Sequence, residues 1–381
     1  MNNTINHMNK ITYVFGNGRE KKLNNNVNYS TDFLYGYDYF LENNYQVTYI
    51  VASESKNKIL IFIEKVLRKI TKLPFYMSNY ISIKNIKIIF SSKVLILSND
   101  PIALSLLPIL IFYKIFRRGK IIVIVMGLLS KPKPNIAVKK LQRLIINFLL
   151  LISTYFIFLG MNEKQNAEIK FPLHNKKLKY IPFCIDTKFW KKVNIEKKYD
   201  LIFVGNDGNR DYIFLIDLLE NLKEYKFLVI SDNQILKNYF KKNKLPNVEF
   251  REGNLSSSAI TDLKLKKLYN SSKISIVPLR NTLQPSGQSV SLQSLASGLP
   301  VLISETKGNW FDGEKIDSKF LYSIKSNDVV LWKEKINFIF DNIVNYQNLS
   351  SDIENFIVKN LDKIYFDQTL ESLIFNKFSK Y

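Results

Sequence analysis

The segment 285–303, PSGQSVSLQSLASGLPVLI, has the residue types and spacing of an anion site. Its middle has helical spacing, opened by small residues at 286–287 and closed by Gly-Leu-Pro at 298–300 before an apolar strand. Backbone N–H groups at such a helix start are unpaired and lie at the positive end of the helix dipole. The segment therefore predicts a diphosphate site. Its candidate contacts are Ser286, Gly287, Gln288 and Ser289, with Gln293 one turn further along to reach a ribose hydroxyl.

Other kinds of catalytic site lack the residues that they need. The serines of this segment have no His and Asp partners to activate them, which argues against a serine hydrolase. With one cysteine, Cys184, and two histidines, His7 and His174, the chain has no internal disulfide and cannot assemble a His/Cys metal cage. The FGNG at 15–18 is only a fragment of a dinucleotide-binding fingerprint, so a strand-ending turn is an equal alternative to a phosphate site.

The elements that must position these residues form two similar series. At 381 residues, with 46% apolar and 23% charged residues, the chain is expected to fold into two domains. Runs rich in Ile, Val and Phe alternate with helical-length segments, as in βαβ units on a parallel sheet. The expected strands are 11–15, 46–52, 93–98, 120–125 and 154–159, then 200–204, 226–230, 247–250, 273–277 and 300–303. A polar, charged linker at 186–199 joins the two series.

Positive charge is concentrated in the first half of the chain. The net charge is +22, of which residues 1–190 carry +18, from 28 basic and 10 acidic residues, and the remainder carries +4, from 27 and 23. Such a surface predicts an anionic partner: nucleic acid, the anionic face of a membrane, or phosphorylated substrates. The alternative is a compositional bias, because Lys, Asn and Ile are abundant throughout the chain.

Two helical segments bear on membrane contact. Segment 58–73 places Lys65, Arg68, Lys69 and Lys72 among Ile, Val and Leu, a pattern suited to an anionic membrane surface; the alternative is a helix on the sheet with a solvated basic face. Segment 135–153 falls short of the about 20 apolar residues that span a bilayer, so we expect a buried helix, with a re-entrant insertion as the alternative. The polar start of the chain predicts no signal peptide. We therefore expect a cytoplasmic protein, peripheral on the inner face of the cell membrane.

Four segments in order resemble the family 4 retaining glycosyltransferases, a group with the GT-B fold, of the bacterial type. They are YIPFCIDTKFW at 180–190, LIFVGNDGNRDY at 201–212, YNSSKISIVP at 269–278 and the helix within 285–303; residues 29–51 resemble the helix and second strand of some bacterial members. The resemblance implies an α/β protein of two Rossmann-like domains, 1–188 and 189–361, that face each other across a cleft. The last helix, at about 362–381, is then expected to cross back to the N-terminal domain.

The resemblance also implies roles for single residues in a retaining transfer from a UDP- or GDP-sugar, without a metal. It makes Gly205 the close-approach glycine after the first strand of the second domain and Arg210 the cation that faces the donor phosphates. It makes Gly16 the glycine that approaches the donor from the first domain. A fixed arginine and helix N–H groups stabilise charge on a leaving diphosphate. Arg280 is a further candidate for donor binding, with a solvated surface position as the alternative.

The chain departs from the family pattern at two places. Where the family usually has two glutamates eight positions apart, this chain has Pro285 and Gln293, and no histidine stands in MGLLSKPK at 126–133, after the fourth strand. A catalytically inactive nucleotide- or sugar-binding protein is therefore an alternative. A nucleic-acid-binding protein is less favoured, because the basic residues alternate with apolar ones and no nucleic-acid module is recognisable. The basic first half favours a lipid or other membrane-associated acceptor, as in glycolipid or polysaccharide synthesis.

Overall fold

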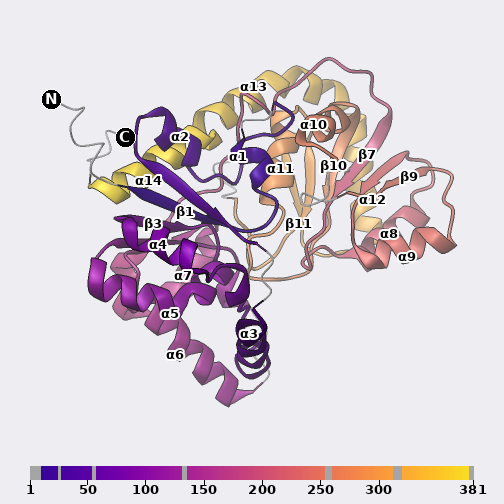
Figure 1. Ribbon diagram of the computed structural model, residues 1–381. Coiled ribbons are helices and arrows are strands. Elements are labelled where there is room, and N and C mark those ends of the chain that lie inside the picture. Colours follow the sequence, from indigo (N-terminus) through magenta and orange to yellow (C-terminus); the bar gives the residue numbers. More distant parts are fainter. Residues whose placement is uncertain are drawn as a thin grey trace. The chain divides into compact units, whose positions relative to one another are not determined.

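The computed structural model describes residues 10–24, 27–53, 57–130, 135–253, 260–311 and 320–376, and the chain divides into two compact units (Figure 1). Unit 1 contains residues 1–24, 33–182 and 366–381, and unit 2 contains residues 25–32 and 183–365. The main division thus falls between Pro182 and Phe183. That residues 25–32 belong to unit 2 was not indicated by any pattern in the sequence.

The core of unit 1 is a parallel sheet of six strands in the order β2-β1-β3-β4-β5-β6. The strands are β1 (Ile11–Phe15), β2 (Val47–Val51), β3 (Val94–Leu97), β4 (Lys120–Val125), β5 (Tyr155–Phe158) and β6 (Leu178–Tyr180). Every residue of β1 and β3 is buried, as expected for strands covered on both faces by helices. The first five strands were predicted from their apolar runs. The sixth was missed because it has only three residues, one of them Lys179.

Unit 2 is also built on a six-stranded parallel sheet, in the order β12-β11-β10-β7-β8-β9. The strands are β7 (Tyr199–Val204), β8 (Phe227–Ile230), β9 (Val248–Arg251), β10 (Ser272–Val277), β11 (Val301–Ser304) and β12 (Leu321–Ile324). Numbered from β7, this order is 3-2-1-4-5-6 read from the β9 edge, which is the Rossmann order. All but β12 were predicted from the sequence.

Helices connect the strands in both units. In unit 1 they are α1 (Glu20–Leu23), α2 (Tyr37–Glu42), α3 (Lys58–Thr71), α4 (Ile83–Ser91), α5 (Asp100–Arg117), α6 (Ile136–Ile152) and α7 (Met161–Lys170), with short 3-10 turns η2 (Met77–Asn79), η3 (Leu128–Ser130) and η4 (Pro172–Lys177). In unit 2 they are α8 (Tyr212–Asn221), α9 (Gln234–Lys242), α10 (Asp262–Asn270), α11 (Gln288–Ala296), α12 (Val329–Asp341) and α13 (Ile343–Leu361). Segment 135–153 is therefore a helix that leads into a buried strand, as the first of its two interpretations expected.

The C-terminal part of the chain is two helices rather than one continuous helix. The break between α13 and α14 (Lys363–Phe375) lies at Asp362, whose backbone is extended and whose carboxylate accepts hydrogen bonds from the amide and hydroxyl of Thr187. From Phe366 onward the chain belongs to unit 1. There Glu371 accepts a hydrogen bond from the Tyr39 hydroxyl at 2.9 Å. The expected return of the chain to the N-terminal domain is thus present from Phe366.

Candidate functional site

The predicted anion site lies where the strand order of unit 2 reverses. From β7 the chain builds β8 and β9 on one side of the sheet and then β10 on the other. Ligands of Rossmann-like sheets bind outside the carboxyl ends of the strands at such a switch point. Two loops leave this point, 205–211 after β7 and 278–287 after β10, and they contain five of the nine predicted donor-binding residues.

Backbone hydrogen bonds fix these two loops to each other. The amide of Arg280 donates to the carbonyl of Asn209 at 2.8 Å, and the amide of Asp211 donates to the carbonyl of Pro278 at 3.1 Å. The side-chain amide of Asn209 donates to Ser286 Oγ at 2.9 Å, which ties the loop after β7 to the residue before Gly287. The loop that carries Arg210 is therefore held beside the start of α11 before any ligand binds.

Polar side chains under the loops add a second layer of fixation. Asp211 caps α8 and accepts a hydrogen bond from Asn327 Nδ2 at 2.8 Å. Asn327 Oδ1 in turn accepts from the Ser304 hydroxyl at 2.7 Å, and Ser304 Oγ accepts from the Leu279 amide at 2.7 Å. This network joins the ends of β10, β11 and β12 to the start of α8. Asn209, Asp211 and Asn327 were not predicted from the sequence.

Arg210 is a buried cation with unused donors. Its side chain is 3% exposed, and Nη1 lies 3.1 Å from Asp207 Oδ2. Its Nε has no hydrogen-bond partner among the described residues. Gly205 makes room for this side chain, because a Cβ on Gly205 would stand 2.6 Å from Arg210 Nε. A buried donor of a guanidinium is rarely left without an acceptor, so the unpartnered Nε makes Arg210 a candidate contact for an anionic ligand.

The electrostatic effect of Arg210 reaches two buried tyrosines. Burial raises the pKa of the Tyr212 hydroxyl to about 12; Asp207 adds to this rise and Arg210 opposes it. Burial also raises the pKa of Tyr269 well above its usual value, and Arg210 again opposes the rise. The guanidinium is thus close enough to both rings to stabilise negative charge there. A phosphate bound beside the guanidinium would be stabilised by the same charge.

The start of α11 has the geometry that the glycine predicted. Gly287 has a φ of +79°, a left-handed conformation that glycine adopts without strain. A Cβ here would stand 2.9 Å from Val277 Cγ1 and 3.2 Å from Ile303 Cδ1. Among the described residues, no side chain caps this helix. Because an uncapped helix start retains its positive potential, it remains available to an anion.

Gln293 is held by a carboxylate from the first part of the chain. Its Nε2 donates to Asp32 Oδ2 at 2.9 Å, and Trp190 Nε1 donates to the same oxygen at 2.6 Å. The amide of Asp186 donates to Asp32 Oδ1 at 2.7 Å, and Asp32 is 2% exposed. A glutamate at 293 would place one carboxylate against another, so this position favours an uncharged side chain. The Gln293 carbonyl keeps an acceptor for a ribose hydroxyl.

The other predicted donor-binding residues have different surroundings. Arg280 is exposed and contacts the site through its backbone, whereas Gln288 is 8% exposed and Ser289 is half-buried. Gly16 lies in unit 1, directly after β1, where the order of that sheet reverses between β1 and β3. A Cβ on Gly16 would meet Asn99 Nδ2 at 3.8 Å, an ordinary contact, so packing alone does not require a glycine there. Its contact with a donor stays a prediction.

Helix α3 presents its apolar residues to solvent. Ile59, Phe62, Ile63, Val66 and Ile70 are all exposed, and they form one stripe at helical spacing. Lys65, Lys69 and Lys72 are also exposed, whereas Arg68 lies 3.6 Å from Glu64 and over the ring of Tyr76. Of the four basic residues assigned to membrane contact, Arg68 is therefore partly engaged within unit 1. No described helix is both long and apolar enough to cross a bilayer.

Metal ligands do not gather in the described part of the chain. Among residues 10–24, 27–53, 57–130, 135–253, 260–311 and 320–376, no three His, Cys, Asp or Glu side chains are arranged to hold a metal ion. His7 lies outside these residues. His174 is buried and contacts Asn147 Oδ1 at 3.0 Å, and desolvation followed by the charge of Lys177 lowers its pKa.

Solved structures share this fold at low sequence identity. A glycosyltransferase from Rickettsia africae ESF-5 is 12% identical with a TM-score of 0.63, covering 97% of this chain and 99% of that one. Anabaena HepE in complex with UDP-glucose is 10% identical, with a TM-score of 0.62 and coverage of 97% and 100%. Sucrose-phosphate synthase from Thermosynechococcus elongatus is 11% identical, with a TM-score of 0.65 and coverage of 96% and 98%. No family model and no curated protein matches the sequence. The structural likenesses confirm the expected GT-B fold.

Proposed function

We propose that this protein is a glycosyltransferase that moves a sugar from a UDP- or GDP-sugar to a membrane-associated acceptor, with retention and without a metal ion. The observation that carries the proposal is Arg210, a 3% exposed guanidinium with an unpartnered Nε among the described residues, fixed beside the uncapped start of α11. Both features lie at the switch point of a Rossmann-ordered sheet, where such folds bind nucleotides.

The chemistry of the site suits departure of a nucleoside diphosphate. When the bond between sugar and phosphate breaks, negative charge grows on the diphosphate oxygens. A cation and a helix start that are already in place stabilise that charge without reorganising. The solved complexes of Anabaena HepE with UDP and with UDP-glucose support a nucleotide-sugar donor for a protein of this fold.

Pro285 and Gln293 stand where the resembled family usually has glutamates, so the catalytic contribution of those carboxylates must come from other residues. Pro285 supplies no carboxylate near the sugar, and Gln293 binds Asp32 rather than adding a second charge. Stabilisation of the leaving group by Arg210 and α11 is therefore the main source of rate in our proposal. A nucleotide-sugar-binding protein without transferase activity is the second candidate, and Pro285 is the observation that favours it.

The acceptor side of the proposal depends on α3. Its stripe of five exposed apolar residues is flanked by Lys65, Lys69 and Lys72, the arrangement of a helix that lies in the interface of an anionic membrane. Unit 1 also contains most of the excess positive charge of the chain. A peripheral position on the membrane would bring the enzyme to an acceptor such as a glycolipid or a lipid-linked glycan.

The donor site is tested by replacing Arg210. We expect Arg210→Ala to weaken binding of UDP or GDP by about 1.5–3 kcal/mol, the range for a charge-assisted hydrogen bond, as measured by calorimetric titration. Arg280→Ala, in the adjoining loop but with an exposed side chain, is expected to have a smaller effect. Unchanged affinity of Arg210→Ala for both nucleotides would remove Arg210 from the site.

Transfer itself is tested with labelled nucleotide sugars. Incubation of the purified protein with labelled UDP- and GDP-sugars and a membrane extract is expected to give a labelled lipid-soluble product. Binding of a nucleotide without transfer or donor hydrolysis would favour the second candidate, the inactive binding protein.

A further inference from the structure

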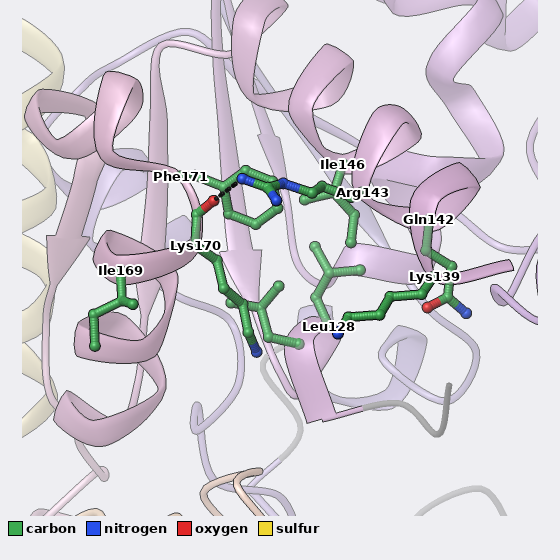
Figure 2. Close-up of a pocket in the computed structure, with 9 residues that line it drawn as sticks. Leu128, Lys139, Gln142, Arg143, Ile146, Ile169, Lys170 and Phe171 are labelled. Carbon is green, nitrogen blue, oxygen red and sulfur yellow. Dashed lines mark hydrogen bonds between the residues drawn. The ribbon is translucent and has the colours of Figure 1, made fainter. Parts of the chain in front are cut away.

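Unit 1 has a pocket of about 250 Å³ among η3, α6 and the end of α7 (Figure 2). Part of its wall is apolar and consists of Leu128, Leu129, Ile146, Ile169 and Phe171. The rest is mainly basic and consists of Lys139, Arg143 and Lys170, with Gln142 between α6 and α3. Among the described residues that line the pocket, none is acidic. None of these residues belongs to the donor site of unit 2.

The cations of the pocket converge from two elements. Figure 2 shows the side chains of Lys139 and Lys170 extending toward each other from α6 and α7. Arg143 Nη2 donates to the backbone carbonyl of Lys170 at 3.2 Å, which joins the two helices. Lys170 Nζ contacts Asn166 Oδ1, whereas the side chain of Lys139 has no ion pair or hydrogen bond with any described residue. The charge of the Lys139 side chain is therefore not neutralised by an ion pair within the described part of unit 1.

We propose that this pocket binds the phosphate head group and first methylenes of an anionic lipid. The basic wall attracts an anion and the apolar wall favours an adjoining hydrocarbon, so a soluble phosphate or a neutral lipid would contact only one of the two favourably. The volume is below the roughly 300–1,000 Å³ of pockets that enclose a whole drug-sized ligand. The remainder of the lipid's hydrocarbon chain must therefore lie outside the pocket.

The surroundings of the pocket favour a lipid that stays in the membrane. Ile169 lines the pocket and is 79% exposed, so it offers an apolar exit for an acyl or prenyl chain. Gln142 Nε2 donates to the carbonyl of Thr71 at 2.8 Å, which fixes the pocket to α3 and its exposed apolar stripe. The inference rests on the proposed membrane-associated acceptor, for which it supplies a binding site.

Short-chain lipids test the pocket without a membrane. We expect dihexanoyl phosphatidic acid, titrated below its micelle concentration, to bind the full-length protein at least about tenfold more tightly than dihexanoyl phosphatidylcholine or glycerol 3-phosphate. Equal binding of phosphatidic acid and glycerol 3-phosphate would overturn the proposal, because the hydrocarbon would then contribute nothing.

Two pairs of matched variants locate the binding. Lys139→Gln is expected to weaken phosphatidic acid binding about fivefold, while Lys140→Gln, the next residue of the same helix and outside the pocket, leaves it unchanged. Ile169→Asp is expected to weaken it at least as much, while Leu173→Asp, 94% exposed and outside the pocket, leaves it unchanged. Equal effects within either pair would overturn the location. Circular dichroism checks that each variant is folded.

A UDP titration of the same variants separates this inference from the proposed function. We expect UDP affinity to be the same in all four, since none of the substituted residues lies in unit 2. Retained UDP binding with no lipid preference would remove the pocket proposal alone. Lipid binding in a wild-type protein that binds neither UDP nor GDP would instead remove the donor site.

Discussion

Helix α11 of unit 2 and helix α3 of unit 1 both reverse the usual distribution of polar and apolar side chains, in opposite directions. Eight of the nine residues of α11 are buried, among them Gln288, Ser291, Gln293 and Ser294. In α3 five large apolar side chains are exposed, while Glu64 is buried. One helix thus buries polar groups, and the other exposes apolar ones.

Each reversal has a specific physical basis. The small and amide side chains of α11 let it pack between β10, β11 and α13 and let Gln293 reach Asp32. The inward face of α3 contains Glu64, whose Oε2 accepts a hydrogen bond from the Ser78 amide at 2.9 Å. Buried polar residues and exposed apolar patches cost stability unless another interaction offsets them. The two reversals are the features on which we base the proposed ligand site at α11 and the proposed membrane contact of α3.

The largest expected effect concerns the start of α11. Gly287→Val places a β-branched side chain at a left-handed φ and against the buried side chains of Val277 and Ile303, so the backbone at the start of α11 must shift. We expect complete loss of UDP binding and of transfer, measured by calorimetry and by product formation. Ser294→Ala, further along the same helix, is expected to leave both intact. Equal loss in the two variants would make α11 a purely structural helix and weaken its contrast with α3.

A second prediction concerns the buried polar contact of α11. We expect Gln293→Glu to destabilise the protein by about 3–5 kcal/mol near neutral pH, and Gln293→Leu, which only removes the hydrogen bond, by about 1.5–3 kcal/mol. Asp32 raises the folded-state pKa of the introduced carboxyl above its unfolded value of about 4.3. The extra loss is therefore absent below that pH and grows as the pH rises.

Urea unfolding of both variants from pH 4 to 8 measures this difference. A constant gap between Gln293→Glu and Gln293→Leu across the range would contradict a carboxylate contact at 293. It would also show that Asp32 does not disfavour a carboxylate at this position.

The smallest expected effect concerns the exposed stripe of α3. Replacing Ile59, Phe62 and Ile70 by Ser should change the free energy of unfolding by less than about 0.5 kcal/mol per residue, because all three side chains are exposed. Sedimentation with anionic vesicles at high salt should fall roughly tenfold, since at least about 1.5 kcal/mol of apolar insertion is lost. Serine at Ile213 and Val330, exposed apolar residues of unit 2, should change neither quantity.

Charge on the same helix gives a further test of the contrast. Glutamate at Lys65, Lys69 and Lys72 should abolish the preference for anionic over neutral vesicles at low salt, because each basic residue contributes about 1 kcal/mol near such a surface. Wild-type protein that ignores anionic vesicles at low ionic strength would leave the exposed stripe without a membrane role.

The features that could be predicted from the sequence are those formed by residues close together in the chain. The strand–loop–helix of β10 and α11 is marked by small residues at 286–287 and by Gly298, all within one short segment of the chain, so its structure was predicted. The contact between Asp32 and Gln293 joins residues from opposite ends of the chain and leaves no trace in spacing or composition. The contact of Asp362 with Thr187 was not indicated for the same reason, because the two residues lie far apart in the chain.

The orientation of α3 was equally beyond the sequence. Periodicity identifies which residues of segment 58–73 share a face but not which face packs on the protein. The buried Glu64 decides this, and its partner Ser78 lies outside the helix. The retaining outcome and the role of Gly16 stay predictions, because they depend on the bound donor.

The division of the chain sets an order on its synthesis. Unit 1 is finished only by residues 366–375, whose Phe375 packs on Tyr45 with ring centroids 5.2 Å apart. A ribosome that has just made residue 182 must therefore add all of 183–365 first, which takes roughly 10–40 seconds. During that interval, unit 2 is able to complete its sheet. The aromatic ring of Tyr45 remains without its contact to Phe375 until residue 375 has been added. Residues 366–375, which are synthesised after unit 2, thus complete unit 1, whose synthesis begins before that of unit 2.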